Sequence, residues 1–237
     1  MRLTLPFVII YFLISCNAEK RPPAKKHLQN DGPKIDYSNQ SVKILRDGSF
    51  IEGKEKIALY NRENPLSVDS LNKIFSVKAN DQFVYEIHST RSQGIPYKQI
   101  TISEVGNTNN RALELITQAD TANLEHLKEQ ISARRDEWIE RCNQHNAEDL
   151  ITEMYLIEAI YFNHKPVIAN QDSLIKEYGY MNRPNYSLHL KPLHVEMVTN
   201  NLAYEIGQCS GSYGGKYIII WTKDKNDKWS VMADSNI

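Results

Sequence analysis

The chain has 237 residues, and its 28 Lys and Arg nearly balance its 29 Asp and Glu, which gives a formal net charge of −1. Domains that bind nucleic acid usually carry a basic excess, so we expect no nucleic-acid partner. The length is sufficient for one large domain or two small ones.

The first residues predict export and lipid attachment. After Arg2, the run from Leu3 to Ile14 is almost wholly apolar. It is too short for a membrane-spanning helix and has the length of the apolar region of a signal peptide. The run ends at Cys16 in a pattern that resembles the bacterial lipobox, in which cleavage leaves a lipid-carrying cysteine. We therefore predict a signal peptide over 1–15 and lipidation of Cys16, with a chance cysteine after an ordinary signal as the alternative.

A lipid anchor at this position would hold the exported protein on a membrane of the bacterial cell envelope, at its periplasmic or outer-membrane face. Residues 16–36 are rich in Lys, Pro, Asn and Gln and have few apolar side chains. Such a composition predicts a flexible tether. No later stretch of the sequence is long and apolar enough to predict a second membrane segment.

Two further cysteines, Cys142 and Cys209, fall on a predicted helix and a predicted strand. An oxidising envelope would allow them to pair. Their spacing is not that of a disulfide framework, so we expect two buried free thiols.

The C-terminal half, 121–237, begins with helical periodicity. Apolar residues recur at three- and four-residue steps from Leu124 to Cys142, and charged residues such as Arg134 and Arg135 are expected on the remaining surface. Further helices are predicted over Ala147–Ile157 and Gln171–Tyr178.

Strands follow the helices. The alternation of apolar and polar residues, with polar turns between the runs, predicts four of them: His194–Val198, Leu202–Gln208, Lys216–Lys223 and Trp229–Asp234. Helices first and an antiparallel meander last make an α+β fold.

Four motifs in this order resemble the NTF2-like superfamily, in particular its SnoaL-like domains and related small domains of unknown function: Trp138 to Leu150, Tyr204 to Gly207, Gly215 to Trp221, and Lys228 to Asp234. The resemblance covers about Glu129 to Ile237. It implies a cone, in which one curved antiparallel sheet wraps around helices.

The N-terminal half, 37–120, contains patterns that return later. In the same order, 49–57 matches 166–174, 80–87 matches 199–206, 97–100 matches 217–220, and 118–120 matches 232–234. Four ordered matches predict an internal repeat, although strands share alternation and two meanders can look alike by chance.

The N-terminal copy is predicted to be partial and mostly β, because no counterpart of the long helix at 121–143 precedes Phe50. A sheet without that helix has a bare face that must be covered. Since NTF2-like domains commonly dimerise through their sheets, the resemblance implies an intrachain pseudo-dimer or a homodimer.

No motif for a metal or cofactor is present in the sequence, such as His-Glu-x-x-His, Cys-x-x-Cys or a phosphate-binding glycine loop. We therefore predict no metal and no cofactor. His189, His194 and Glu196 are close in sequence but lack a further ligand, so a solvent-facing strand pair is the expected arrangement.

Aromatic residues from helix and sheet are expected to converge, making either a packed core or an apolar pocket: Trp138, Tyr155, Tyr204, Tyr217 and Trp221. The polar candidates for such a pocket are Glu158, Glu205 and Asp234, with His164 as a further titratable group.

A buried carboxylate beside Tyr or His could act as a general base. Strand parity puts Glu205 and Tyr204 on opposite faces of the sheet, and parity alone does not say which face is interior. The match of Asp234 with Asp120 favours a structural role for Asp234, such as a bond from its side chain to the backbone.

The leading hypothesis from the sequence is a non-catalytic envelope lipoprotein, and the sequence alone does not decide whether the protein is an enzyme. Its C-terminal domain would bind a small apolar or amphipathic molecule, or a protein partner. Fold does not determine function, so two alternatives stay open. One is an isomerase, dehydratase or hydrolase that uses the same cavity, and the other is a structural scaffold with a filled cone.

Overall fold

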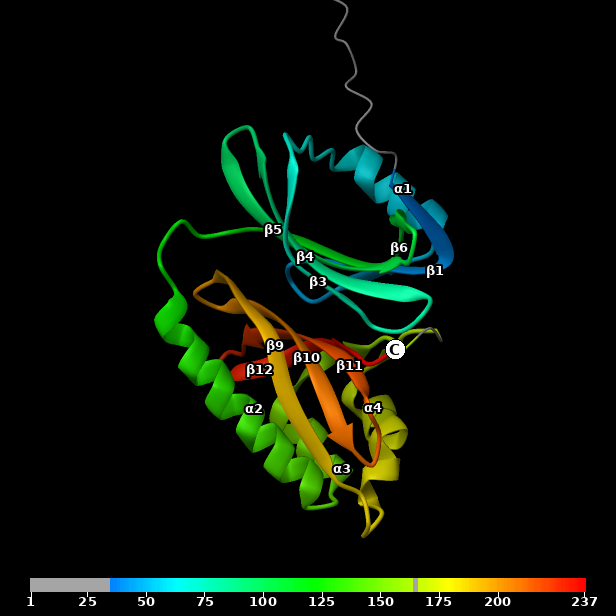
Figure 1. Cartoon of the computed structure of the whole chain (residues 1–237), viewed down its shortest axis with the longest axis vertical. Helices are drawn as coiled ribbons and strands as arrows, with labels where there is room; N and C mark the ends of the chain where they lie inside the picture. The colour runs from blue at the N-terminus through cyan, green and yellow to red at the C-terminus, as the bar shows by residue number, and fades with distance from the viewer. Residues whose placement is uncertain (1–34, 164–165) are drawn as a thin grey trace, which may run out of the picture. The chain divides into compact units, whose positions relative to one another are not determined.

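Two six-stranded sheets make up the computed structural model, which describes residues 35–163 and 166–237 (Figure 1). The predicted signal peptide, Cys16, most of the tether and His164 lie outside the described residues. All described residues belong to one compact unit, Pro33–Ile237. Within these ranges no helix has both the length and the hydropathy that crossing a membrane requires.

The first sheet and one helix form the N-terminal half. In chain order its elements are β1 (Asp36–Ile44), β2 (Phe50–Glu52), α1 (Lys54–Glu63), β3 (Leu71–Lys78), β4 (Phe83–Ser92), β5 (Ile95–Glu104) and β6 (Asn107–Gln118). The order across the sheet is β2-β1-β6-β5-β4-β3. Strand β1 runs parallel to β6, and the other neighbours are antiparallel.

The second sheet and three further α-helices form the C-terminal half. Its elements are η1 (Glu125–Leu127), α2 (Lys128–Asn143), α3 (Ala147–Met154), β7 (Tyr155–Tyr161), β8 (Ile168–Ala169), α4 (Gln171–Tyr178), η2 (Gly179–Asn182), β9 (Leu188–Thr199), β10 (Leu202–Gly211), β11 (Gly215–Lys223) and β12 (Trp229–Ser235). The order across the sheet is β8-β7-β12-β11-β10-β9, with β7 parallel to β12.

The two sheets have the same topology, including the parallel pair, as expected for an internal repeat. The helix that follows the second strand is also shared, since α1 follows β2 and α4 follows β8. Both helices begin after a residue with positive φ, Gly53 at 95° and Asn170 at 70°. Glycine and asparagine are the residues that adopt this conformation most readily.

The α+β class is confirmed, and the C-terminal half has the predicted arrangement of helices against a curved sheet (Figure 1). Each sheet is mixed rather than wholly antiparallel. The helix predicted over 147–157 is too long, because α3 ends at Met154 and Tyr155 begins β7. The residues after Met154 are mostly β-branched or aromatic and pair with β12, which favours a strand.

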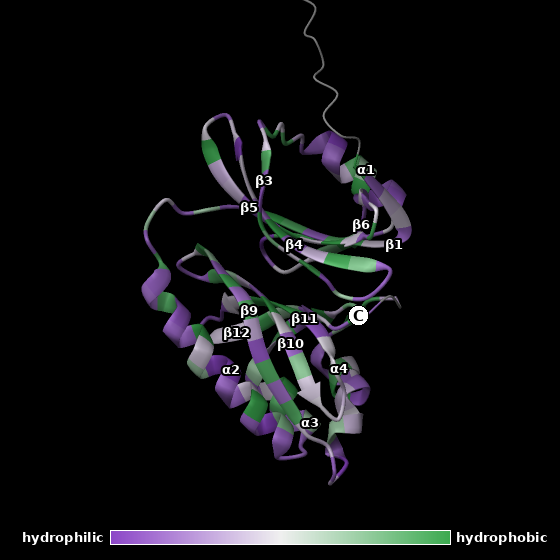
Figure 2. Ribbon diagram, viewed as in Figure 1, coloured by the Kyte–Doolittle hydropathy of each residue, from purple (hydrophilic) through white to green (hydrophobic). Residues whose placement is uncertain are grey.

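Helix α2 buries one face and leaves the rest hydrophilic (Figure 2). Its buried residues include Ile131, Arg134, Arg135, Trp138 and Cys142. The prediction that both arginines lie on the solvated surface is therefore wrong. At helical spacing Arg135 falls between Ile131 and Trp138 on the core side, where its charge is paired with Glu205.

The second sheet packs on both of its faces. Alternation along β10 sends Ala203 and Glu205 toward the helices, and Tyr204 and Ile206 toward the first sheet. The first set belongs to a core between sheet and helices, and the second to an apolar core that includes residues of both sheets.

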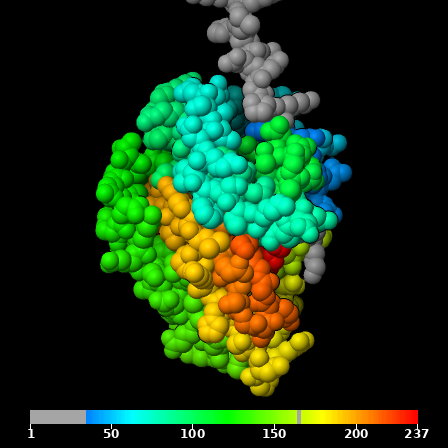
Figure 3. Space-filling view, viewed as in Figure 1, coloured from blue at the N-terminus to red at the C-terminus, as the bar shows by residue number. Residues whose placement is uncertain are grey.

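Polar contacts also join the halves, whose atoms meet in a continuous surface (Figure 3). The Lys98 Nζ lies 2.5 Å from the Glu196 carboxylate, and the Tyr204 hydroxyl donates to the Lys98 carbonyl at 3.5 Å. His194 stacks on Phe75 with 5.1 Å between ring centroids. The expected solvent-facing His194–Glu196 pair thus lies at the contact between the halves. The described residues contain no group of three side chains that could hold a metal ion.

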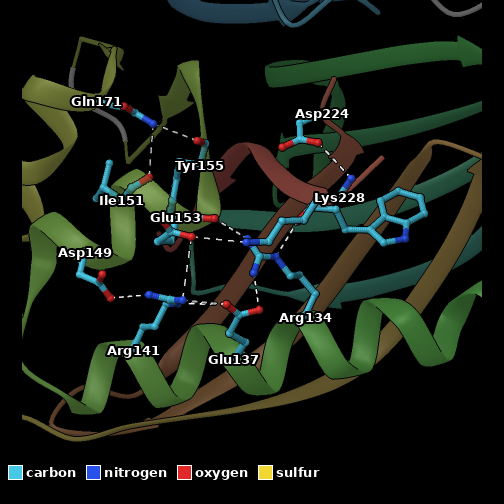
Figure 4. Close-up of polar contacts among 11 residues, drawn as sticks. Arg134, Glu137, Arg141, Asp149, Ile151, Glu153, Tyr155, Gln171, Asp224 and Lys228 are labelled. Carbon is cyan, nitrogen blue, oxygen red and sulfur yellow. Dashed lines mark hydrogen bonds and ion pairs between the residues drawn. The ribbon is translucent and has the colours of Figure 1, made fainter. Parts of the chain in front are cut away.

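An arginine network fixes the helices against the sheet (Figure 4). The Arg134 Nε donates to the Trp229 carbonyl of β12 at 2.7 Å, and its guanidinium also donates to the Glu153 carbonyl at the end of α3. Arg141 pairs with Asp149 of α3. These contacts hold the helices α2 and α3 in a fixed position relative to each other and to β12.

Candidate functional site

Asp234 lies on β12 and is 6% exposed. Its Oδ2 accepts hydrogen bonds from the Tyr155 hydroxyl at 3.0 Å and from the Tyr178 hydroxyl. Its Oδ1 has no hydrogen-bond partner among the described residues. More than nine in ten buried polar groups in proteins are paired, so a buried carboxylate oxygen without a partner needs an explanation.

The surroundings of Asp234 disfavour its charged form. Burial raises the pKa of the carboxyl from 3.8 to about 7, although the hydrogen bonds from Tyr178, Tyr155 and the Asp234 backbone N–H act in the opposite direction. Burial and the charge of Asp234 also raise the pKa of both tyrosines well above 10.0. Near neutral pH the aspartate can therefore exchange a proton while both hydroxyls stay protonated.

A cavity borders this carboxylate. About 70 Å³ is open there to the centres of water-sized molecules, and the walls include Asp234, Trp138 and Tyr217. Since one water needs roughly 10–15 Å³ of such space, several waters or a small ligand would fit. Trp138, also a wall residue, has a buried Nε1 that no described residue pairs. A recess of about 420 Å³ adjoins the cavity and shares Tyr180, Tyr213 and other wall residues with it.

Four tyrosines, Tyr178, Tyr180, Tyr186 and Tyr213, form an aromatic cluster along the cavity. The ring of Tyr180 lies 5.6 Å from that of Tyr186 and 5.7 Å from that of Tyr213, with interplanar angles of 65° and 87°. Tyr213 is 55% exposed, which places the cluster partly at the mouth. None of these four was predicted as a site residue. They come from α4, η2 and two connecting segments, and only the tertiary fold brings them together.

Glu205 has a structural role. Its carboxylate accepts from the Arg135 Nε at 2.6 Å, the Tyr217 hydroxyl at 2.7 Å and the Trp221 Nε1 at 2.9 Å. Burial alone lowers the pKa of Arg135, but the bond and the charge of Glu205 outweigh it and raise that pKa. A buried carboxylate with three donors is satisfied, so Glu205 fixes α2 to the sheet.

Gly207 makes room for Tyr217, its cross-strand partner. A Cβ atom at Gly207 would lie 2.2 Å from the Cζ of the Tyr217 ring. The absence of a side chain therefore lets the ring lie across β10 and bring its hydroxyl to Glu205.

The first sheet holds a counterpart of the Asp234 site. In the second sheet, Asp234 of β12 is the cross-strand partner of Ile219 of β11, and Ile219 is in turn the partner of Glu205 of β10. In the N-terminal half, Glu114 is opposite Thr101 in the same way.

Thr101 is in turn opposite Glu86, which follows Tyr85 as Glu205 follows Tyr204. The register thus aligns Asp234 with Glu114, and the match of Asp234 with Asp120 is wrong. The Tyr37 hydroxyl donates to Glu114 at 3.2 Å, as Tyr155 does to Asp234.

The two carboxylates differ in their charged neighbours. Glu114 pairs with the Lys43 Nζ at 2.5 Å and with the Arg111 guanidinium. Burial first, and then the charge of Arg111, lower the pKa of Lys43 to about 8. For Asp234, no ion pair with a described residue is present. At this pair of equivalent positions, the carboxyl of the C-terminal half lacks the cationic partners that the carboxyl of the N-terminal half has.

The other predicted site residues occupy different places. Trp138, Tyr217 and Asp234 border the cavity, and Tyr155 reaches it through its bond to Asp234. Trp221 is fully buried in the core beside Glu205. Two predictions are wrong, because Tyr204 faces the first sheet and Glu158 is exposed on β7.

Cys142 and Cys209 are both buried and unpaired. Burial raises the pKa of each thiol. Cys209 borders the cavity, whereas Cys142 lies in the core against Met181.

No protein-family model matches the sequence, and no curated protein matches it. Similar solved structures include an NTF-2 like protein of unknown function from Shewanella oneidensis, with TM-score 0.41, 14% identity and coverage of 46% of this chain and 96% of that chain. A ketosteroid isomerase-like protein from Erwinia carotovora has TM-score 0.37 and 13% identity, covering 48% of this chain and 95% of its own. An NTF2-like superfamily protein from Salmonella enterica has TM-score 0.40 and 14% identity, covering 48% and 91%. NTF2-like proteins are thus among the solved structures that match about half of this chain.

Proposed function

We propose that the cavity of the C-terminal half binds a small amphipathic molecule. Its polar group would face Asp234, and its apolar body would lie against the tyrosine cluster. One observation supports this most strongly: Asp234 and Trp138 both line the cavity, and each has a buried polar atom, Oδ1 and Nε1, that lacks a partner within the described chain. A ligand with a hydrogen-bonding group would supply the missing partner.

A filled structural core explains these atoms less well. In a closely packed core the polar atoms would be paired within the protein, as all three donors to Glu205 are. Asp234, in contrast, lines a cavity and has an oxygen without a partner among the described residues.

The test is to fill the cavity from its wall. Leu190 lies half-buried on β9 and borders the cavity, so Leu190→Trp should occupy the space. Leu193 is on the same strand, 39% exposed, and is not among the described wall residues, so Leu193→Trp is the matched control. Binding of small aromatic and amphipathic fragments to the full-length protein is measured by ligand-observed NMR.

Wild type and Leu193→Trp should bind the same fragments, and Leu190→Trp should lose them. Fragments that bind all three proteins equally would place binding outside the cavity. An absence of binding to the wild type would favour the structural scaffold.

A second candidate function is proton transfer to or from the bound molecule. The observation in its favour is that the pKa of Asp234 is raised to about 7, where a carboxyl can act as a general base or acid near neutral pH. We infer that small ketones held in the cavity would exchange their α-hydrogens with solvent. In deuterated water, exchange should be faster with wild type than with Asp234→Asn and should rise with pH as the carboxylate forms. Equal exchange with both proteins would exclude this role.

We further propose that the protein works on a membrane of the bacterial envelope, attached through Cys16. The support is the sequence of residues 1–16 alone, with its short apolar run and terminal cysteine. The cavity would then act on molecules that reach the membrane surface.

A further inference from the structure

The walls of the cavity differ in charge from an ordinary apolar pocket. Asp234 is the one acidic residue among the described wall residues, and none of those residues is Lys, Arg or His. The remaining walls are mostly aromatic or aliphatic, with six aromatic side chains: Trp138, Tyr178, Tyr180, Tyr186, Tyr213 and Tyr217.

We infer that the molecule bound in this cavity is a cation, namely a small amine or quaternary ammonium compound. This inference rests on the function proposed above and specifies the charge of its ligand. A protonated amine would donate a hydrogen bond to the Asp234 Oδ1, which no described group does, and a quaternary ammonium would pair with the carboxylate by charge alone. The faces of aromatic rings carry negative potential and attract cations, so aromatic walls and a carboxylate favour the same ligand.

Other charge classes fit poorly. An anion would meet a carboxylate with no cationic side chain among the described walls to offset the repulsion. A neutral molecule could bind by its apolar surface and donate a hydrogen bond to Asp234, but it would lack the attraction between opposite charges. The equivalent carboxylate of the N-terminal half, Glu114, already has Lys43 and Arg111 as cationic partners, so it has no need of a cationic ligand.

Asp234 must be ionised to attract a cation, which makes the inference testable by pH. Six groups have pKa values that respond to the charge of Asp234: Tyr155 and Tyr161 of β7, Tyr178 of α4, Tyr180 of η2, Cys142 of α2 and Tyr85 of β4. The neighbouring strand β11 places the apolar Ile219 opposite Asp234. The pKa of each of the six groups is raised, mainly by burial, so all of them stay neutral near pH 7. The pKa of Asp234 is about 7, so among these groups it alone changes charge between pH 6 and pH 8.

The experiment compares three probes of nearly equal shape by isothermal titration calorimetry with the full-length protein. Choline is the cation, 3,3-dimethyl-1-butanol is its neutral counterpart, and 3,3-dimethylbutyrate is an anion with the same branched end. At pH 8 choline should bind about tenfold or more tightly than the alcohol, as expected for a desolvated cation among aromatic rings.

Lowering the pH from 8 to 6 should weaken choline binding about tenfold, because a carboxyl with a pKa of about 7 goes from roughly nine-tenths to one-tenth ionised. Affinity for the alcohol should not follow this trend. Asp234→Asn should remove the preference for choline and its pH dependence. Asp172→Asn, which removes an exposed carboxylate from α4, is the matched control and should keep both.

Each other outcome has a defined meaning. If the alcohol binds as tightly as choline at pH 8, small-molecule binding stands and the cation inference is wrong. Tighter binding of the anion would also overturn it. If none of the three binds, the cavity does not take a ligand of this size and the inference fails, whereas fragment binding that Leu190→Trp removes would still support the proposed function. Should Asp234→Asn not fold, the pH dependence and the probe comparison in the wild type decide the question.

Discussion

Replacing Asp234 by Asn should stabilise the protein at neutral and alkaline pH and have little effect in acid. Burial raises the pKa of this carboxyl from 3.8 to about 7. Below pH 3.8 the group is protonated in both the folded and the unfolded chain. As the pH rises toward 7, the unfolded chain loses the proton while the folded protein keeps it. The folded state is therefore progressively disfavoured, and above pH 7 the loss stays constant.

The size of the effect follows from the two pKa values. Their difference, at 1.36 kcal/mol for each pH unit, amounts to ~4 kcal/mol of unfolding free energy lost between about pH 4 and pH 7. Asparagine has a similar shape and can accept hydrogen bonds from Tyr155 and Tyr178, but it does not titrate. The difference in stability between variant and wild type should therefore grow with pH by about this amount.

The assay is urea unfolding of wild type and Asp234→Asn at intervals from pH 4 to pH 8. Asp172→Asn measures the effect of removing one exposed negative charge from the same half. A difference that does not change with pH would show that the fold does not raise the pKa of Asp234. A difference that falls with rising pH would show that the fold stabilises the carboxylate, contrary to our account.

Three further predictions concern other parts of the chain. Cys16→Ser should abolish metabolic lipid labelling and leave the uncleaved precursor, and unchanged labelling would refute the anchor. Gly207→Ala should displace Tyr217 from Glu205 and lower the unfolding free energy by about 1–3 kcal/mol, because a buried acceptor loses its donor; unchanged urea unfolding would contradict this. Protease cleavage engineered at 121–123, between the halves, should leave two fragments that co-elute, because one apolar core includes both sheets. Fragments that separate and each unfold cooperatively would refute that prediction.

Much of the C-terminal fold was readable from local patterns. Helix α4 has the predicted bounds, and β10, β11 and β12 begin within a residue of the predicted strands. The motif matches of 49–57 and 80–87 agree with the shared topology of the two sheets. The matches of 97–100 with 217–220 and of 118–120 with 232–234 are shifted from the pairing that the strand register gives. Strands with alternating apolar and polar residues resemble one another at several offsets, so sequence alone does not fix the alignment.

The site was only partly predictable, for physical reasons. Asp234 and Trp138 were candidates from their residue type and periodicity. The tyrosine cluster was missed because its members come from short connections whose positions depend on the whole fold. The alternation of side chains along β10 separates Glu205 from Tyr204, but it does not say which of the two faces the helices. The core-side spacing of Arg135 in α2 was a usable signal, since an arginine between two core positions implies a buried acid partner.

The central claim is that the C-terminal cavity holds a small molecule at Asp234. The most direct measurement is a crystal structure of the protein purified at pH 8 without removal of co-purifying small molecules. Our account predicts non-protein electron density in the cavity, within hydrogen-bonding distance of the Asp234 Oδ1 and against the tyrosine cluster. A cavity closed by protein side chains, with that oxygen bonded to a protein donor, would contradict it.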